Sequence, residues 1–391
     1  MLDISLDQLV EVQGEGPLTH RLGLLAAQQL EYPVIEVDAA GLITDISSDP
    51  KIRSEAILTP TFLDVHIHGA AGHDVMNCSA AGLSEVQRFL ARRGTGHYLP
   101  TTVTASIDDT LRALEALSGA IERPTPGDEA IPIGIHLEGP FLSHGKRGVH
   151  LAELLQQPSI ALFDRFQQAA RGHIRLMTVA PELPGAPEMI AYAAAQGVRV
   201  SLGHTNATAA EATAGINVGA TSATHTFNAM RSMESREPGV LGVVLDDQNL
   251  YAELICDGIH VAPAMVRIWL RLKGDRAILM TDGISATGMP DGPYVLAGVP
   301  ITVADGKASV TAAPGTLAGS VLTMDRAVEN LQAFTGCALE TAVRAASSQP
   351  ASMLGIADTI ASLRVGQPAN FNQFSVGGRL EATYLRGERL R

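Results

Sequence analysis

The segment Leu63-Asp64-Val65-His66-Ile67-His68-Gly69 predicts a buried β-strand that ends at a pair of histidines. Alternate side chains of a strand point to the same face, so His66 and His68 would project together where a glycine-rich turn begins. Two neighbouring imidazoles suit a divalent metal ion, although two histidines in a polar loop would be the simpler interpretation. The choice depends on whether other metal-ligating residues follow other strands.

Beyond this segment, short apolar runs alternate with helix-like segments as far as residue 282. This alternation indicates a parallel sheet, and eight such runs fit a closed (β/α)₈ barrel of about 250 residues. The rival, an open doubly wound sheet, normally has a Gly-x-Gly-x-x-Gly turn after its first strand, and residues 68–73 do not supply one. The predicted strands are Leu63–His68, Tyr98–Thr104, Ile131–Glu138, Arg175–Ala180, Arg199–His204, Thr221–Phe227, Tyr251–Cys256 and Ala277–Asp282, and the predicted helices include Ala80–Arg93, Asp108–Ile121, Glu188–Gln196 and Ala262–Leu272.

The two ends of the chain lack this alternation and predict a small β domain built from both termini. We expect residues 1–58 and 358–391 to form it, with residues 59–357 as the catalytic barrel. Strands are predicted near Ile35–Asp38 and Gly41–Ile46, where apolar and polar residues alternate around a turn. Within the barrel, the glycine- and proline-rich residues 283–319 predict a hairpin excursion, and helices are expected at 324–335 and 339–353.

Composition and charge limit the kinds of molecule that the protein is expected to bind. The 391 residues are 46% hydrophobic and 18% charged, with 28 basic and 41 acidic residues and a net charge of −13. An excess of negative charge argues against nucleic acid or an anionic membrane as partner. The three cysteines are far apart and the N-terminus lacks the pattern of a signal peptide, so we expect a cytoplasmic protein with no disulfide framework and no membrane span.

Metal-ligating side chains follow several of the predicted strands. Functional residues of a (β/α)₈ barrel lie at the carboxyl ends of its strands, so these side chains would converge on one rim. Each has an ordinary explanation when it is taken alone, such as a helix N-cap for an aspartate or a loop hydrogen bond for a histidine. Together they predict a metal centre made by His66, His68, Glu138, His204, His225 and Asp282.

The chemistry of this set favours hydrolysis. Imidazole and carboxylate ligands suit Zn²⁺ or Fe²⁺, and an open coordination position on such an ion holds a water molecule. The ion lowers the pKa of that water and polarises a carbonyl group. Asp282 is the candidate that takes the proton of the water and passes it to a leaving amine.

Six motifs lie in order along the chain: Asp-Val-His-Ile-His-Gly (64–69), His-Leu-Glu-Gly-Pro-Phe (136–141), Gly-His-Thr-Asn-Ala-Thr (203–208), Thr-His-Thr-Phe-Asn-Ala-Met (224–230), Cys-Asp-Gly-Ile-His-Val (256–261) and Met-Thr-Asp-Gly (280–283). As a set they resemble the N-acetylglucosamine-6-phosphate deacetylases of the amidohydrolase superfamily. The resemblance covers roughly residues 56–357. It implies a (β/α)₈ TIM barrel with a small β-sandwich formed by both termini.

The resemblance also implies roles for the metal-binding residues. Glu138, His204 and His225 match the ligands of the main metal ion. His66 and His68 match the ligands of a second ion, which only some members of the family hold, and Glu138 would then bridge the two ions. Asp282 would be the general base and acid, and a metal-bound hydroxide would be the nucleophile.

Further matches imply a site for the substrate. His150 matches a residue near the N-acetyl group, and Asn228 and Ala229 match other substrate contacts. Arg236 and His260 match groups that hold a phosphate, and in the family these can come from the neighbouring subunit of a homodimer. The residues alone leave two alternatives open: Arg236 forming a surface ion pair with Glu234 or Glu237, and His260 having a structural hydrogen-bonding role.

The implied activity is removal of acetate from N-acetylglucosamine 6-phosphate, which gives glucosamine 6-phosphate. The first alternative is the same reaction on N-acetylgalactosamine 6-phosphate or another N-acyl amino sugar. The second is a barrel that binds an amino-sugar phosphate as a sensor without catalysis. A sensor needs neither a water-activating metal nor Asp282, so the full set of predicted ligands argues against it.

Overall fold

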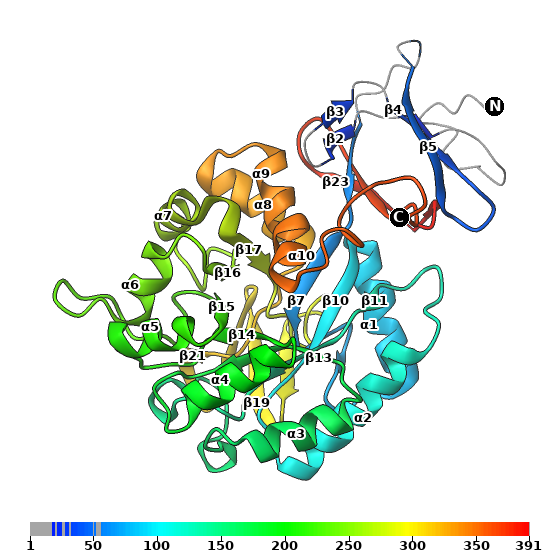
Figure 1. The fold of residues 1–391 in the computed structure, drawn as a ribbon. Helices are drawn as coiled ribbons and strands as arrows, with labels where there is room; N and C mark the ends of the chain where they lie inside the picture. Colours follow the sequence, from blue (N-terminus) through cyan, green and yellow to red (C-terminus); the bar gives the residue numbers. More distant parts are fainter. Residues whose placement is uncertain are drawn as a thin grey trace.

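The structure is a computed structural model that describes residues 18–19, 22–25, 28–30, 33–49, 51 and 56–390. Strands and helices of a barrel form the larger body in Figure 1, and short strands from both ends of the chain lie together beside it. No helix among these residues has both the length and the apolar character needed to cross a membrane.

The barrel is built from parallel strands that pair in chain order from β7 to β17. Residues 62–67 of the first strand are all buried, as expected for a parallel sheet covered on both faces. The barrel strands in the described part of the chain are β7 Phe62–Ile67, β10 Thr95–Thr102, β12 Ile135–Glu138, β13 Ile174–Val179, β14 Arg199–Leu202, β15 Ala220–Ala223, β16 Tyr251–Ile255 and β17 Ala277–Met280, with the short β11 Ile131–Pro132 pairing beside β10.

A seam of hydrogen bonds between β7 and the end of β17 closes the barrel. The Asp282 amide donates to the His66 carbonyl at 2.9 Å, and the His68 amide donates to the Gly283 carbonyl at 2.8 Å. Deeper in the seam, the Asp64 carboxyl group accepts the Thr281 hydroxyl at 2.6 Å. The seam therefore fixes the ends of the first and last strands, which carry His66, His68 and Asp282, directly against each other.

Helices surround the barrel strands and bury their apolar faces against them (Figure 1). Serine side chains cap the first two at their amino ends: Ser79 accepts from the Gly82 amide, and Ser106 accepts from the Asp109 amide. The helices among the described residues are α1 Ala80–Arg92, α2 Ile107–Glu122, α3 Ile160–Ala169, α4 Ala186–Ala195, α5 Ala209–Asn217, α6 Gly239–Asp246, α7 Pro263–Lys273, α8 Met324–Thr335, α9 Leu339–Ala346 and α10 Ser348–Leu354.

The excursion predicted for residues 283–319 is a four-stranded antiparallel sheet, in the order β18-β19-β20-β21. Its buried face packs on Val103 at the barrel rim and on Ile284 and Ala286. The Ser320 amide donates to the Asp282 carbonyl at 2.7 Å, so the sheet ends where the last barrel strand ends. The strands are β18 Gly292–Leu296, β19 Val299–Ala304, β20 Lys307–Val310 and β21 Ala313–Leu317, and a small hairpin, β8 Gly69–Ala70 with β9 His73–Asp74, follows β7.

The two ends of the chain meet in antiparallel sheets, as the sequence predicted. Strand β6 (Ile57–Pro60) pairs with β22 (Phe371–Phe374), which continues into β23 (Leu380–Leu385) and β24 (Glu388–Arg389). A second sheet joins β1, β4 and β5, and β2 pairs with β3; these strands are Leu18–Thr19, Pro33–Val37, Ile43–Ser48, Leu22–Leu25 and Gln28–Leu30. The rest of the predicted segment 1–58 lies outside the described residues, and the domain boundaries at 58 and 357 stay predictions.

The helix predicted over residues 339–353 is two helices, which is a correction with a local cause. Ser347 lies between them with φ −140° and ψ −80°, outside the helical region. Pro350 has no amide hydrogen, and its ring would clash with the carbonyl four residues earlier in a continuous helix. The chain therefore begins a new helix at Ser348, where a proline in the first turn is tolerated.

Candidate metal centre

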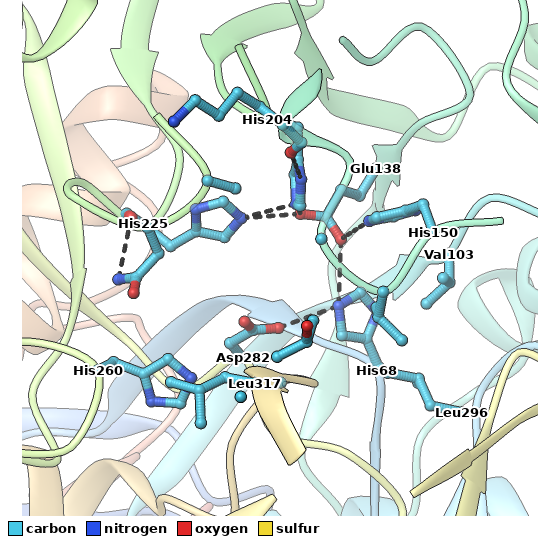
Figure 2. A pocket seen from close by; sticks show the side chains of 18 of the residues that line it. His68, Val103, Glu138, His150, His204, His225, His260, Asp282, Leu296 and Leu317 are labelled. Carbon is cyan, nitrogen blue, oxygen red and sulfur yellow. Dashed lines mark hydrogen bonds and ion pairs between the residues drawn. The ribbon is translucent and has the colours of Figure 1, made fainter. Parts of the chain in front are cut away.

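Two groups of buried side chains meet at the carboxyl ends of the barrel strands. One contains Glu138, His204 and His225, and the other contains His66, His68 and Asp282. The Glu138 carboxylate joins them (Figure 2), because Oε1 lies 3.3 Å from Nε2 of both His204 and His225, whereas Oε2 lies 3.2 Å from Nε2 of His68. Glu138 thus has the geometry of a carboxylate that bridges two cation sites.

In their neutral form, the imidazoles that converge in this centre have no protons on the nitrogens that face one another. Nδ1 of His204 donates to the Lys146 carbonyl at 2.8 Å, and Nδ1 of His68 donates to the Thr101 carbonyl at 3.0 Å. In the neutral rings, Nε2 therefore presents a lone pair. Nε2 of His204 nevertheless lies 3.0 Å from Nε2 of His225, close to a carboxylate oxygen. Several lone pairs pointing at one place require a cation, so these residues fit a divalent metal ion.

The backbone at three of these positions takes a conformation that L-amino acids rarely adopt. The φ angles of His204, His225 and Asp282 are +47°, +31° and +52°. Such angles cost of order 1–3 kcal/mol at a residue other than glycine and cluster at functional sites. Each of these residues lies two positions after the last residue of a barrel strand, β14, β15 or β17. This geometry also explains why β14, β15 and β17 end earlier than predicted, because positive φ angles cannot continue a strand.

Asp282 is ionised in this setting. Burial alone would raise the pKa of its carboxyl group, but the charge of His66 and the hydrogen bond from His68 lower it to about 2. Oδ1 of Asp282 lies 3.1 Å from Nε2 of His68 and 3.5 Å from Nε2 of His66. The carboxylate can therefore accept a proton beside both metal-binding groups.

His150 presents a hydrogen-bond donor to the same space. Nδ1 of His150 accepts from the Thr104 amide at 3.3 Å and lies 2.8 Å from its hydroxyl, so a neutral ring carries its proton on Nε2. Burial and, to a smaller extent, the charge of His204 together lower the pKa of His150 to about 3, which keeps the ring neutral. Nε2 of His150 lies 3.7 Å from Oε2 of Glu138, and both residues line the cavity next to the metal-binding groups.

A cavity of about 400 Å³ opens onto both metal-binding groups. His150, Asn228, Ala229 and His260 line it together with the predicted ligands, except for His66, which lies deeper. In Figure 2, His260 lies across the cavity from His150, and Val103 and Leu296 lie beside His68. Nδ1 of His260 is 2.6 Å from Oδ2 of Asp257, which fixes the orientation of its ring.

Arg236 does not line this cavity. It is exposed in the loop before α6, and no described residue forms an ion pair with it. The alternative of a surface ion pair with Glu234 or Glu237 is therefore not seen. Glu237 instead accepts hydrogen bonds from the Ala209 and Gly239 amides, which also hold the pKa of its carboxyl group below the ordinary value.

Some residues around the centre were not selected from the sequence. Asp64 lies two residues before His66, and His136 lies two residues before Glu138, so the alternation of a strand places each on the same face as a ligand. This two-residue spacing is visible in the sequence alone. Leu296 and Leu317 line the cavity from the antiparallel sheet of residues 292–317, and no local pattern in the sequence indicates this long-range contact.

The fold and the site together define the class: a (β/α)₈ barrel with imidazole and carboxylate metal ligands at the carboxyl rim of its strands. The chain belongs to the Amidohydrolase family, which matches residues 57–390.

Similar proteins and solved structures agree with this assignment. The chain is 36% identical to N-acetylgalactosamine-6-phosphate deacetylase of Escherichia coli O157:H7, over 86% of this chain and 88% of that protein. It is 33% identical to N-acetylglucosamine-6-phosphate deacetylase of Vibrio furnissii, over 90% of each chain. A solved structure of a variant of N-acetyl-D-glucosamine-6-phosphate deacetylase from Mycobacterium smegmatis, in complex with N-acetyl-D-glucosamine-6-phosphate, has a TM-score of 0.89 and 32% identity, and the match covers 96% of this chain and 99% of that one.

Proposed function

We propose that this protein is a metal-dependent hydrolase that removes acetate from N-acetylglucosamine 6-phosphate. The observation that carries the proposal is the Glu138 carboxylate shared by two groups of buried histidines, with ionised Asp282 on the same cavity. The family and the substrates named for its relatives support it. The test is to measure acetate release from N-acetylglucosamine 6-phosphate, N-acetylgalactosamine 6-phosphate and unphosphorylated N-acetylglucosamine. Hydrolysis of none of them by metal-loaded protein would overturn the proposal.

Glu138, His204 and His225 would hold the main metal ion, and His66 and His68 would hold a second one against the other oxygen of Glu138. A divalent ion, Zn²⁺ or Fe²⁺, would supply a water of lowered pKa and would polarise the amide carbonyl. The ligands themselves are buried, and the low exposure to water strengthens the charge interactions among them.

Asp282 and His150 would act on opposite sides of the amide group. The Nε2–H of His150 donates to the acetyl oxygen and stabilises the negative charge that develops there. Oδ1 of Asp282 accepts the proton of the attacking water and delivers it to the nitrogen that leaves. Asn228 and Ala229 line the same cavity and would contact the sugar.

The phosphate group would be held by His260 and by Arg236 of a neighbouring subunit. His260 lines the cavity, whereas Arg236 is exposed outside it. Arginine offers a rigid, bidentate donor for a phosphate, and a protein of net charge −13 needs such a local group to bind an anion. We therefore propose a homodimer in which Arg236 reaches the cavity of the partner.

We expect Arg236→Ala to raise KM for N-acetylglucosamine 6-phosphate by about 10- to 100-fold, because a charge-assisted hydrogen bond contributes about 1.5–3 kcal/mol. Turnover of unphosphorylated N-acetylglucosamine should not change. Arg231→Ala, in the same loop, serves as the control. Steady-state kinetics on both sugars measures the difference, and an equal loss on the two sugars would exclude a phosphate contact for Arg236.

One relative supports the epimer N-acetylgalactosamine 6-phosphate as an alternative substrate. The similarity to the Escherichia coli O157:H7 protein concerns an enzyme named for N-acetylgalactosamine 6-phosphate. Relatives named for N-acetylglucosamine 6-phosphate occur in bacteria and mammals, and the solved structure in complex with a phosphosugar holds that substrate. We therefore place N-acetylglucosamine 6-phosphate first. The ratio of kcat/KM for the two phosphosugars tests this order.

Metal uptake should depend on pH. Burial alone would lower the pKa of His68, but hydrogen bonds and charges from Asp282 and Glu138 raise it well above the ordinary value in the metal-free protein. A metal ion must displace that proton, so we expect affinity to rise between about pH 6 and about pH 8. Zn²⁺ titration of metal-free protein with a pH indicator measures affinity and proton release together. An affinity that stays constant over this range would contradict the assignment of His68 as a ligand.

We also propose a cytoplasmic location. Cys78, Cys256 and Cys337 are all free thiols, which suits a reducing compartment.

A further inference from the structure

A chain of hydrogen-bonded polar side chains crosses the barrel interior one layer below the metal-binding groups. Nε2 of His136 lies 2.8 Å from the Thr178 hydroxyl, which lies 2.8 Å from the Thr224 hydroxyl. Thr224 donates to the Ser201 hydroxyl at 2.7 Å, and Ser201 donates to Oε1 of Glu253 at 3.2 Å. All five residues, here called the hydroxyl chain, have an exposed fraction of 0%.

Packing alone does not explain this layer. The interior of a (β/α)₈ barrel is usually filled by valine, isoleucine and leucine side chains. Buried polar groups carry a desolvation cost that only their hydrogen bonds offset, so a connected set of them is retained for a specific geometry rather than for stability. Burial also raises the pKa of Glu253 to about 8, so its carboxyl group stays mainly uncharged at neutral pH and ends the chain without adding a buried charge.

The hydroxyl chain lies next to metal ligands on several strands. His136 precedes Glu138 by two residues on β12 and so points to the same side of that strand. Thr224 directly precedes His225, and Ser201 lies on β14, the strand that leads to His204. His136, Thr224 and Ser201 therefore each lie within three residues of a proposed ligand in the sequence.

Two of the imidazoles lack the usual support for their orientation. A metal-binding histidine generally donates its other ring N–H to a carboxylate or carbonyl, as His68 and His204 do here. Nδ1 of His66 and Nδ1 of His225 are buried and have no hydrogen-bond partner among the described residues. The orientation of these two rings therefore depends on the side chains packed against them.

His136 supplies that packing for His66. The two rings meet edge to face, with centroids 4.6 Å apart and an interplanar angle of 88°. The orientation of the His136 ring is set in turn by Thr178 at Nε2 and by the Thr101 hydroxyl, 3.4 Å from Nδ1. Thr101 is also the residue whose carbonyl orients His68.

We propose that the hydroxyl chain is a positioning network that holds the imidazoles of both metal-binding groups and thereby sets the metal affinity of the centre. This inference rests on the proposed metal-dependent function but not on the identity of the sugar. Thr178 is the link to break, because it contacts both His136 and Thr224. Valine has nearly the shape of threonine, but a methyl group takes the place of the hydroxyl group.

The test compares Thr178→Val, Thr178→Ser and the unaltered full-length protein by Co²⁺ titration of the metal-free forms against a chelator. Co²⁺ is the probe because its absorption spectrum reports ligand geometry. We expect Thr178→Val to bind Co²⁺ about 10- to 100-fold more weakly, with a shifted spectrum, as for other residues that support metal ligands. Thr178→Ser should restore affinity to within about threefold, since it restores the hydroxyl group. Thr110→Val, which removes a buried hydroxyl from α2, should match the unaltered protein.

A folded Thr178→Val protein with unaltered Co²⁺ affinity and spectrum would overturn the inference. If that variant does not fold, as judged by circular dichroism, Ser201→Ala breaks the chain at the next hydroxyl and decides the question in the same titration. Failure of the unaltered protein to bind Co²⁺ would instead overturn the proposed metal-dependent function, and the inference with it. The two failures are therefore distinguishable.

Discussion

Asp282→Asn should lower kcat by about 10²- to 10⁴-fold, which is the contribution of a general base and acid. Asparagine keeps the shape of aspartate but cannot accept the proton of the attacking water. It also tolerates the left-handed backbone better than alanine would, and Asp282 has a φ of +52°. The substitution therefore removes the chemistry of the side chain without disturbing the turn that carries it.

Metal analysis accompanies this kinetic measurement. The ion held by Glu138, His204 and His225 should remain, because the ion pairs of Asp282 in the described part of the chain are with His66 and His68 and not with these three ligands. Asp325→Asn is the matched control, since Asp325 is also a buried carboxylate but pairs with Arg93 outside the cavity. A kcat of Asp282→Asn within about threefold of the unaltered protein would remove Asp282 from the mechanism.

Glu138→Gln should abolish metal binding and activity together. The glutamine amide cannot offer a negative oxygen to each of the two groups that the Glu138 carboxylate now joins. A bound metal ion stabilises the transition state by several kcal/mol. Losing about 4 kcal/mol of this stabilisation would lower kcat/KM about 10³-fold. The metal content of the purified protein, measured by mass spectrometry, should fall in parallel.

Glu129→Gln provides the control for Glu138→Gln. Glu129 is as deeply buried but pairs with Arg88 and Ser84, away from the cavity. The Glu129→Gln protein should keep both its metal and its activity. If Glu138→Gln retained a full complement of metal, the shared carboxylate would not be a ligand and the proposed centre would be wrong.

The barrel could be predicted from the sequence because its strands are short, buried on both faces and separated by amphipathic helices. The prediction of a (β/α)₈ barrel with terminal antiparallel strands is confirmed. The ends of strands were less predictable. His225 and Phe227 continue the pattern of β15 in sequence, but their φ angles of +31° and +81° turn the chain toward the cavity. That conformation depends on contacts with neighbouring strands and not on local propensity.

The candidate centre could be predicted only as a set of strand-end residues. The spacing of His66 and His68 placed them on one face, and the structure brings their Nε2 atoms to within 3.2 Å. The bridging role of Glu138 was implied only by the family resemblance, because the residues alone could not indicate that its two oxygens divide between two groups. The residues also could not indicate the hydroxyl chain, because threonine and serine on separate strands carry no signal until the barrel aligns them.

Acetate release from N-acetylglucosamine 6-phosphate by protein stripped of metal and then reloaded tests the central claim most directly. We predict that the stripped protein is inactive and that stoichiometric Zn²⁺ or Fe²⁺ restores release of acetate. Release of acetate at the full rate by protein shown to be free of metal would contradict the account, as would the absence of release from fully loaded protein.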